Sequence, residues 1–100
     1  MTRTTTLLKI PATHPSLPGH FPGNPVVPGA VILSEVAAAG MDCLGAVRVT
    51  GFAAVKFLSP LLPEQAAEIR FTDKGPGLSA FDVVANGQHI AGGTLRYERP

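Results

Sequence analysis

A run of apolar residues in the first half of the chain predicts one buried helix. Residues 30–39, Ala-Val-Ile-Leu-Ser-Glu-Val-Ala-Ala-Ala, are apolar on nearly every face, a pattern typical of a helix that protein surrounds on all sides. Pro28 suits the first helical turn, where a missing N–H costs nothing, and Gly40 or Gly45 provides a stop. Polar residues interrupt this stretch too often for a membrane span, which needs about 20 apolar residues.

β-branched and alternating patterns on both sides of this helix predict strands. One strand precedes the helix at residues 4–10, and the four that follow lie at residues 46–58, 65–73, 78–85 and 89–98. Asn86-Gly87 is typical of a type I′ hairpin, because that turn needs a positive φ at both central residues. Residues 73–77 form a looser turn. One strand, a long loop, one helix and four strands in a meander predict an α+β architecture, with an antiparallel sheet curled around the helix.

The long loop before the helix is rich in proline. Six of the ten prolines fall between residues 11 and 28. Proline fixes φ and restrains the residue before it, so a loop of this kind loses little entropy when it becomes ordered. We therefore expect a stiff loop that can hold a side chain still.

Composition narrows the classes of protein to consider. One hundred residues fit one domain, and only 15% are charged while 45% are hydrophobic, which favours self-association because an ordinary soluble domain has about 25% charged residues. The net charge of +1 provides no basic stripe for nucleic acid. Cys43 is the only cysteine. A single cysteine excludes an internal disulfide and indicates a reducing compartment. We expect Cys43 to be a small buried apolar residue. The first residues lack the apolar core of a secretory signal, which predicts a cytoplasmic protein.

Candidate chemistry gathers at the end of the loop, from His20 to Gly29, directly before the helix. An ordinary histidine titrates near neutrality, so His20 can accept a proton there. The first N–H groups of the helix, from Gly29 onward, lack intrahelical partners and carry the positive end of the helix dipole, so they can hold an oxyanion. Gly29 has no Cβ, and a ligand carbonyl can therefore approach its backbone closely. A base beside an oxyanion site suits abstraction of a proton next to a carbonyl.

The same segment, His20-Phe-Pro-Gly-Asn-Pro-Val-Val-Pro-Gly29, resembles the signature of the hotdog-fold 3-hydroxyacyl-acyl-carrier-protein dehydratases, the hydroxymyristoyl and hydroxydecanoyl dehydratase-like family. Their signature has the form HFPGxPxxPG and is followed by an apolar helix. Lys56-Phe57, with Pro60 and Pro63, is similar to the strand and turn that follow the helix in that family. The resemblance extends more loosely over most of the chain and implies a single hotdog domain over residues 1–100.

The resemblance implies dehydration of 3-hydroxyacyl thioesters to trans-2-enoyl thioesters, in fatty-acid synthesis or a related lipid or polyene pathway. The substrate is carried on the phosphopantetheine of acyl carrier protein, and no other cofactor and no metal is implied. His20 takes the α proton, the Gly29 N–H polarises the thioester carbonyl, and Val26 shapes the site around the histidine. The other expected substrate-binding residues are Phe21, Pro28 and Ala30. A carboxylic acid on the helix of the other subunit protonates the departing hydroxyl, so the resemblance also implies a site that spans a dimer.

The chain departs from the family pattern at this acid. The family places Asp or Glu fourteen residues after the histidine, where this chain has Ser34, and Glu35 comes one residue later. One residue is a rotation of about 100° on a helix, which aims Glu35 in another direction. Either Glu35 serves as the acid through an altered helix start or shifted register, or Ser34 acts with a water in a slower or altered reaction. Otherwise the protein binds acyl thioesters with little or no catalysis, or provides His20 to a heterodimer whose partner has the carboxylate.

The remaining candidate residues give weaker evidence for a function. Glu35 has a purely structural explanation as a buried carboxylate paired with Lys56 or an arginine. His14 and His20 lack nearby acidic or cysteine ligands for a metal, and His89 is expected at an exposed strand end. A hotdog thioesterase is a third possibility that the HFPG loop argues against. An acidic carrier protein needs cations near the substrate entrance, for which the candidates are Arg48, Lys56, Arg70, Arg96 and Arg99.

Overall fold

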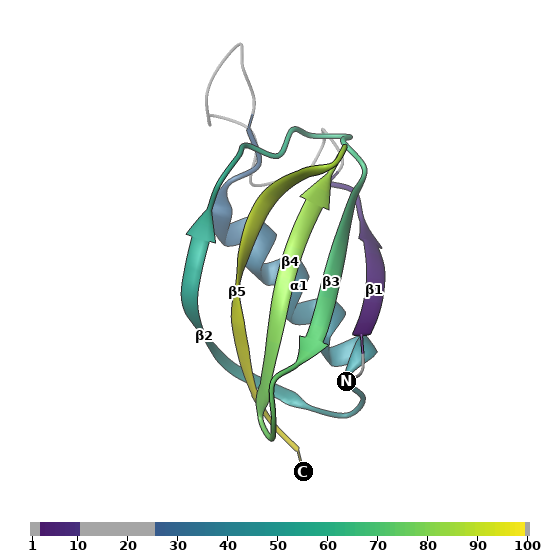
Figure 1. Cartoon of the computed structure of the whole chain (residues 1–100). Helices are drawn as coiled ribbons and strands as arrows, with labels where there is room; N and C mark the ends of the chain where they lie inside the picture. Colours follow the sequence, from purple (N-terminus) through teal and green to yellow (C-terminus); the bar gives the residue numbers. More distant parts are fainter. Residues whose placement is uncertain (1–2, 11–25, 100) are drawn as a thin grey trace.

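The computed structural model describes residues 3–10 and 26–99. Over these residues an antiparallel sheet curls around a helix, as Figure 1 shows. This arrangement confirms the predicted α+β hotdog fold, and each predicted element is present close to its expected bounds. The elements in chain order are β1 (Arg3–Leu8), α1 (Gly29–Cys43), β2 (Arg48–Phe57), β3 (Ala67–Asp73), β4 (Leu78–Ala85) and β5 (Gln88–Glu98).

The order of the strands differs from the predicted meander. In the described sheet the order is β1-β3-β4-β5-β2, with every pair antiparallel. Only β3, β4 and β5 follow one another as a meander, while β2 pairs with the far edge of β5. The physical reason is that β1 already occupies the free edge of β3, where Thr6 stands opposite Ile69. The chain therefore crosses the end of the sheet between β2 and β3 (Figure 1).

The core lies between the concave face of the sheet and one face of α1. Alternate residues of β3 and β4 point into it, as the period of two along a strand requires. Phe71, Phe81 and Val83 of the sheet and Val36 of the helix are each at most 1% exposed. Burying a side chain of this size contributes about 1.5–3 kcal/mol, so this layer supplies much of the driving force for folding.

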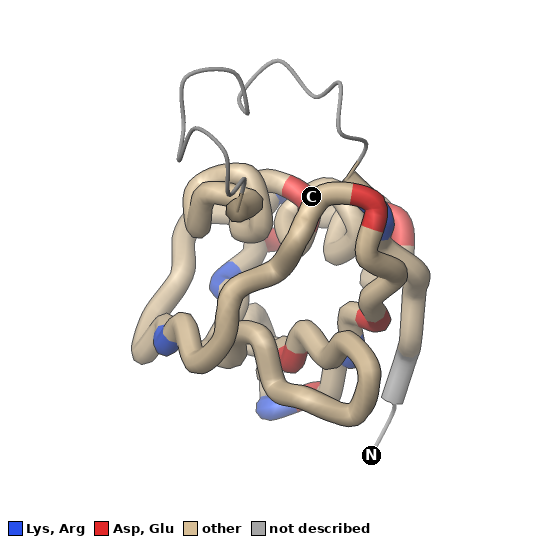
Figure 2. Tube along the Cα trace, turned by 90° about the horizontal axis from the view of Figure 1, so that it is seen from above, with Lys and Arg blue, Asp and Glu red and all other residues tan. Residues whose placement is uncertain are grey.

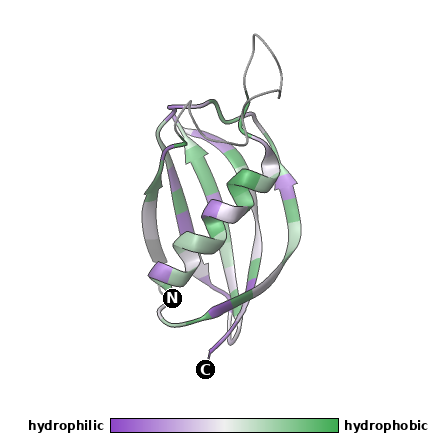
Figure 3. Cartoon of the chain, turned by 180° about the vertical axis from the view of Figure 1, so that it is seen from behind, coloured by the Kyte–Doolittle hydropathy of each residue, from purple (hydrophilic) through white to green (hydrophobic). Residues whose placement is uncertain are grey.

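The helix is covered on one side only. Its buried residues are Val31, Ile32, Val36 and Gly40. The exposed face carries Ala30, Ser34, Ala38 and Met41. Figure 3 shows α1 in front of the sheet, with no other element of the described chain over it. The expectation of a helix enclosed on all sides is therefore wrong for the described part of a single chain, because the sheet curls around one face of the helix and does not close over the other.

The turns follow the predicted chemistry. Asn86 and Gly87 have φ values of 51° and 75°, as a type I′ hairpin between β4 and β5 requires. In the turn between β3 and β4, the Gly75 amide donates a hydrogen bond of 2.9 Å to Asp73 Oδ1. Across residues 3–10 and 26–99, no helix is both long and apolar enough to cross a membrane.

The edge strand β2 contains a strained bulge. The register with β5 shifts between Ala53 and Lys56, and Ala54 has a φ of 53°. An alanine in this left-handed region is uncommon and costs about 1–2 kcal/mol. Gly93 stands on the opposite strand, where a Cβ would lie 3.1 Å from both Ala53 O and Val55 Cα. The missing side chain of Gly93 allows the bulged backbone to approach.

Replacing Ala54 with glycine should stabilise the fold. Ala54→Gly relieves the left-handed strain but increases the entropy of the unfolded chain, so the free energy of unfolding should rise by up to about 1 kcal/mol. The matched control is Ala53→Gly, at the neighbouring position without a positive φ, which should lose about 0.5–1 kcal/mol. Urea unfolding followed by circular dichroism measures both, and a loss of stability in both variants would contradict the strain at Ala54.

Candidate functional site

The predicted site residues divide into those that the structure describes and those that it does not. His20 and Phe21 lie outside the described residues, and so does His14. The structure does describe the end of the loop, from Val26 to Gly29, and the whole of α1. The geometry below therefore concerns the helix side of the predicted site.

An apolar hollow opens at the start of α1. Its volume is about 620 Å³, within the range of about 300–1,000 Å³ that is typical of small-molecule sites. Two chain segments and one helix residue form its walls: Val26, Val27, Pro28 and Gly29 before and at the helix start, Ile32 in the helix, and Phe57, Leu58, Ser59, Pro60 and Leu61 after β2. The Val27 amide donates a hydrogen bond of 2.8 Å to Leu61 O, which ties the two segments together.

The first turn of α1 leaves backbone donors available. Pro28 is the N-cap residue and makes no side-chain cap, but its carbonyl accepts hydrogen bonds from Val31 N at 3.0 Å and Ile32 N at 3.2 Å. The amides of Gly29 and Ala30 have no acceptor among the residues that the structure describes. Such amides at a helix start carry a positive partial charge. Because Gly29 also lines the hollow, its N–H is a suitable donor to the oxygen of a bound carbonyl.

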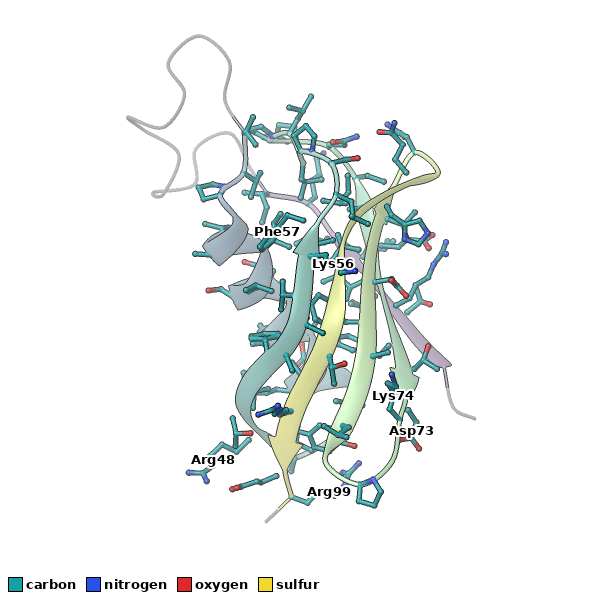
Figure 4. All side chains as sticks on the ribbon, turned by 60° about the vertical axis from the view of Figure 1, so that its left-hand side comes forward. Arg48, Lys56, Phe57, Asp73, Lys74 and Arg99 are labelled. Carbon is teal, nitrogen blue, oxygen red and sulfur yellow. The ribbon has the colours of Figure 1, made fainter. Side chains whose placement is uncertain are left out.

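Phe57 covers Gly29. A Cβ at Gly29 would lie 2.7 Å from Phe57 Cζ, closer than real side chains approach, so any side chain at this position would displace the ring. Figure 4 shows Phe57 at the upper end of β2, beside the start of α1. Phe57 is not among the predicted site residues, although Lys56-Phe57 is part of the similarity to the dehydratase family. That similarity was the available signal.

Of the predicted site residues within α1, only Gly29 lines the hollow. Val26, Pro28 and Gly29 line it, but Ala30, Ser34 and Glu35 do not. Ser34 is exposed, whereas Glu35 is half-buried. Glu35 follows Gly29 by six residues, or about 9 Å along the helix axis. Within residues 3–10 and 26–99, no Lys or Arg forms a salt bridge with Glu35, so the pairing with Lys56 or an arginine is not present there.

The candidate cations do not gather at the hollow. Arg48 and Arg99 lie at the opposite end of the sheet from Phe57 (Figure 4). Arg48 contacts Glu98 at 2.5 Å, and Arg99 donates a hydrogen bond of 2.9 Å to Leu44 O at the end of α1. In Figure 2, basic and acidic residues occur at several separate places along the described trace.

The two cations nearer the middle of the sheet differ in their partners. Arg70 contacts Glu68 at 3.1 Å. Lys56 directly precedes the Phe57 wall and has no ion pair in the described part of the chain. Among the five candidate cations, Lys56 is therefore the nearest in sequence to the hollow. No acidic residue in the described part of the chain forms an ion pair with it.

His89 has the exposed position that the sequence predicts, whereas Cys43, which is expected to be buried, is only half-buried. His89 lies near the start of β5 with 60% of its side chain exposed and with Nδ1 3.9 Å from Asp82 Oδ1. Cys43 ends α1 and is half-buried against the core. Burial raises the pKa of the Cys43 thiol above its ordinary 9.0, and the neighbouring Asp42 carboxylate raises it further. A thiol with a raised pKa is a poor nucleophile at neutral pH, because the thiolate is the reactive form.

Cys43 should therefore react slowly with iodoacetamide in the folded protein. At pH 7.5 its alkylation rate should be severalfold below that of the urea-unfolded chain, and the folded rate should rise steeply only above pH 9. Because the folded pKa lies above the unfolded one, this thiol stabilises the fold at neutral pH, and that contribution is lost as the pH rises through the folded pKa. Mass spectrometry of the alkylated protein measures the rates, and equal rates in both states would contradict the raised pKa.

Comparison with known proteins shows which family the sequence matches. The model of the ApeI-like family, described as ApeI dehydratase, matches residues 1–94. Over 104 aligned residues the chain is 28% identical to the 3-hydroxyacyl-[acyl-carrier-protein] dehydratase FabZ of Thermus thermophilus. The alignment covers 91% of this chain and 73% of that protein.

Solved structures agree with the fold. The dehydratase heterocomplex ApeI:P from Xenorhabdus doucetiae superposes with a TM-score of 0.82 at 22% identity, covering 97% of this chain and 88% of that one. An uncharacterized protein from Erwinia carotovora subsp. atroseptica superposes with a TM-score of 0.77 at 18% identity, covering 97% and 83%. At these identities the likeness establishes the fold.

Proposed function

This chain belongs to the ApeI-like dehydratase family, and from that premise we propose that it removes water from 3-hydroxyacyl thioesters carried on acyl carrier protein. The product is a trans-2-enoyl thioester, formed in fatty-acid synthesis or a related lipid or polyene pathway. The likeness to FabZ, which is named for this substrate, supports the proposal. We expect the reaction in the cytoplasm.

One observation carries the proposal: an apolar hollow and an available backbone donor occur together at the start of α1. The hollow suits an acyl chain, and the Gly29 N–H at its wall has no acceptor within the described residues. In the sequence, His20 is the ninth residue before Gly29. An acyl thioester bound with its carbonyl at Gly29 has its acidic α carbon near the helix start, and we propose that His20 takes the proton from it there.

In the proposed reaction, the His20 imidazole takes the proton from the α carbon. The electron pair of that C–H bond forms the new carbon–carbon double bond, and the β hydroxyl departs as water with a proton from a carboxylic acid. Negative charge develops on the thioester oxygen, and the Gly29 N–H stabilises it. Each proton transfer of this kind contributes about 10²–10⁴-fold to the rate.

We propose that the acid is Glu35 of the partner subunit in a dimer. Within one chain, Glu35 does not line the hollow, but it lies beside the exposed face of α1 and has no salt bridge in the described residues. A second subunit packed along this face and the β2 edge brings its own helix toward the hollow. Twofold symmetry then completes both sites in the same way.

A second candidate function is an acyl-thioester-binding subunit of a heteromeric complex. The specific observation in its favour is Ser34, which takes the family's acid position and is exposed. The superposition on the ApeI:P heterocomplex also favours it. In such a complex the other subunit has the carboxylate, and this chain alone binds acyl thioesters without turning them over.

Replacing His20 should abolish catalysis. For His20→Ala we expect kcat for hydration of a trans-2-enoyl thioester to fall by at least about 10²-fold, because the base is lost. Loss of the enoyl absorbance in a spectrophotometer measures the rate. The matched control is His14→Ala, in the same loop, which should keep nearly full activity. Retained activity in His20→Ala would refute the assignment of the base.

Two helix variants separate the possible acids. Glu35→Gln should lower kcat by about 10²–10⁴-fold, because the amide cannot donate a proton as an acid does, while Ser34→Ala should stay within about twofold of the wild type. The opposite result would assign the proton to Ser34 and its water. If the purified chain has no turnover but binds an enoyl thioester in calorimetry, the heteromeric alternative replaces the first proposal.

A further inference from the structure

The first turn of α1 begins without the usual side-chain cap. Ser, Thr, Asp or Asn normally occupies the N-cap position and accepts a hydrogen bond from an amide of the first turn. Here the N-cap is Pro28, which has no side-chain acceptor, and the first turn contains no acidic residue. A capping oxygen would lie in front of the amides that the proposed function assigns to the thioester. The chain therefore needs another way to fix the helix start.

Phe57 provides a contact at this position. The three atoms nearest to where a Cβ of Gly29 would stand are Cζ, Cε1 and Cε2 of Phe57, at 2.7, 3.0 and 3.1 Å. The far end of the ring is therefore seated on the glycine. The same residue is 51% exposed, so burial alone does not account for an aromatic ring in this place.

The backbone that carries the ring is braced. Phe57 stands opposite Ala91 in the β2–β5 ladder, and Ala91 is fully buried. Directly after it, Leu58 N and Ser59 N both donate to Ile90 O, at 2.8 and 3.3 Å. The backbone at Phe57 is thus fixed by its pairing with β5, which lies inside the sheet.

A second link joins the same segment to the loop before the helix. The Val27 amide donates to Leu61 O at 2.8 Å, and Leu61 is fully buried. The helix start is therefore held between a backbone hydrogen bond on one side of Pro28 and the Phe57 ring on the other. Neither contact uses the amide of Gly29.

We propose that Phe57 is a positioning residue whose ring replaces the N-cap in fixing the first turn of α1, so that the Gly29 amide stays free to donate to the thioester carbonyl. This inference rests on the proposed function, since it concerns the same amide. The hydrogen bond to that carbonyl strengthens as negative charge develops in the transition state. A displaced amide therefore lowers kcat more than it weakens substrate binding.

The test compares two neighbouring substitutions in the hollow. Phe57→Leu removes the end of the ring, and the matched control Leu58→Ala removes bulk from a residue that lines the same hollow and is 60% exposed. Loss of an oxyanion donor costs about 10²–10³-fold in kcat, so for Phe57→Leu we expect a loss of at least about 10-fold with KM within about twofold. Leu58→Ala should change KM and leave kcat within about twofold.

A third variant and a second readout protect the test against misfolding and against failure of the proposed function. Phe57→Met, whose unbranched chain can still reach Gly29, should recover most of the lost kcat. Independently of activity, the amide resonances of Gly29 and Ala30 in a ¹⁵N-labelled protein should shift in Phe57→Leu and keep their positions in Leu58→Ala.

The outcomes are distinct. Equal kcat losses in Phe57→Leu and Leu58→Ala, or an unchanged kcat in both, would overturn the positioning role in an active enzyme. If the wild type turns over no 3-hydroxyacyl or enoyl thioester, the proposed function fails. The resonances of Gly29 and Ala30 then decide the role of Phe57: it is supported if they shift only in Phe57→Leu and rejected if they do not.

Discussion

Burial of one face of α1 against the concave sheet is the interaction on which the rest of the structure depends. Val36 is fully buried at the middle of the helix, and a Cβ at Gly40 would lie 3.1 Å from a methyl group of Leu95. This close approach fixes the helix across the strands. It also fixes the direction of the helix, so that the N-terminal end lies beside the end of β2. The hollow forms at that end because the segment before α1 and the segment after β2 meet there, and no strand of the described residues runs between them.

Much of this could be predicted from the sequence because the determining signals are local. The apolar run of α1, the alternation in β3 and β4, and the Asn86-Gly87 turn each act over a few residues, and each is confirmed. The position of β2 could not be predicted in this way. Its place beside β5 follows from the competition of β1 for the edge of β3, a contact between distant parts of the chain that leaves no local pattern.

The site shows the same division. The loop motif ending at Gly29 indicated the helix start, and the hollow lies there. The contact of Phe57 with Gly29 could not be read from periodicity, because it joins residues 28 positions apart through the fold. The exposed face of α1 was also missed. Alanines on this face, such as Ala30 and Ala38, are apolar like the residues of the core. The sequence pattern therefore does not show which face of the helix the sheet covers and which face it leaves exposed. His20 remains a prediction, since it lies outside the described residues.

The place of β2 has a consequence for how the protein reaches its folded state. Arg48 meets Glu98 fifty positions further along the chain, and β2 pairs with β5 alone in the described sheet. Ordering such a long intervening segment costs entropy before any ladder bond forms, and topologies dominated by distant pairings fold in milliseconds to seconds. During synthesis, β3, β4 and β5 are all made after β2. The amides of β2 therefore have no strand partner until β5 has been made, and pairing of β2 with β5 completes the described sheet last.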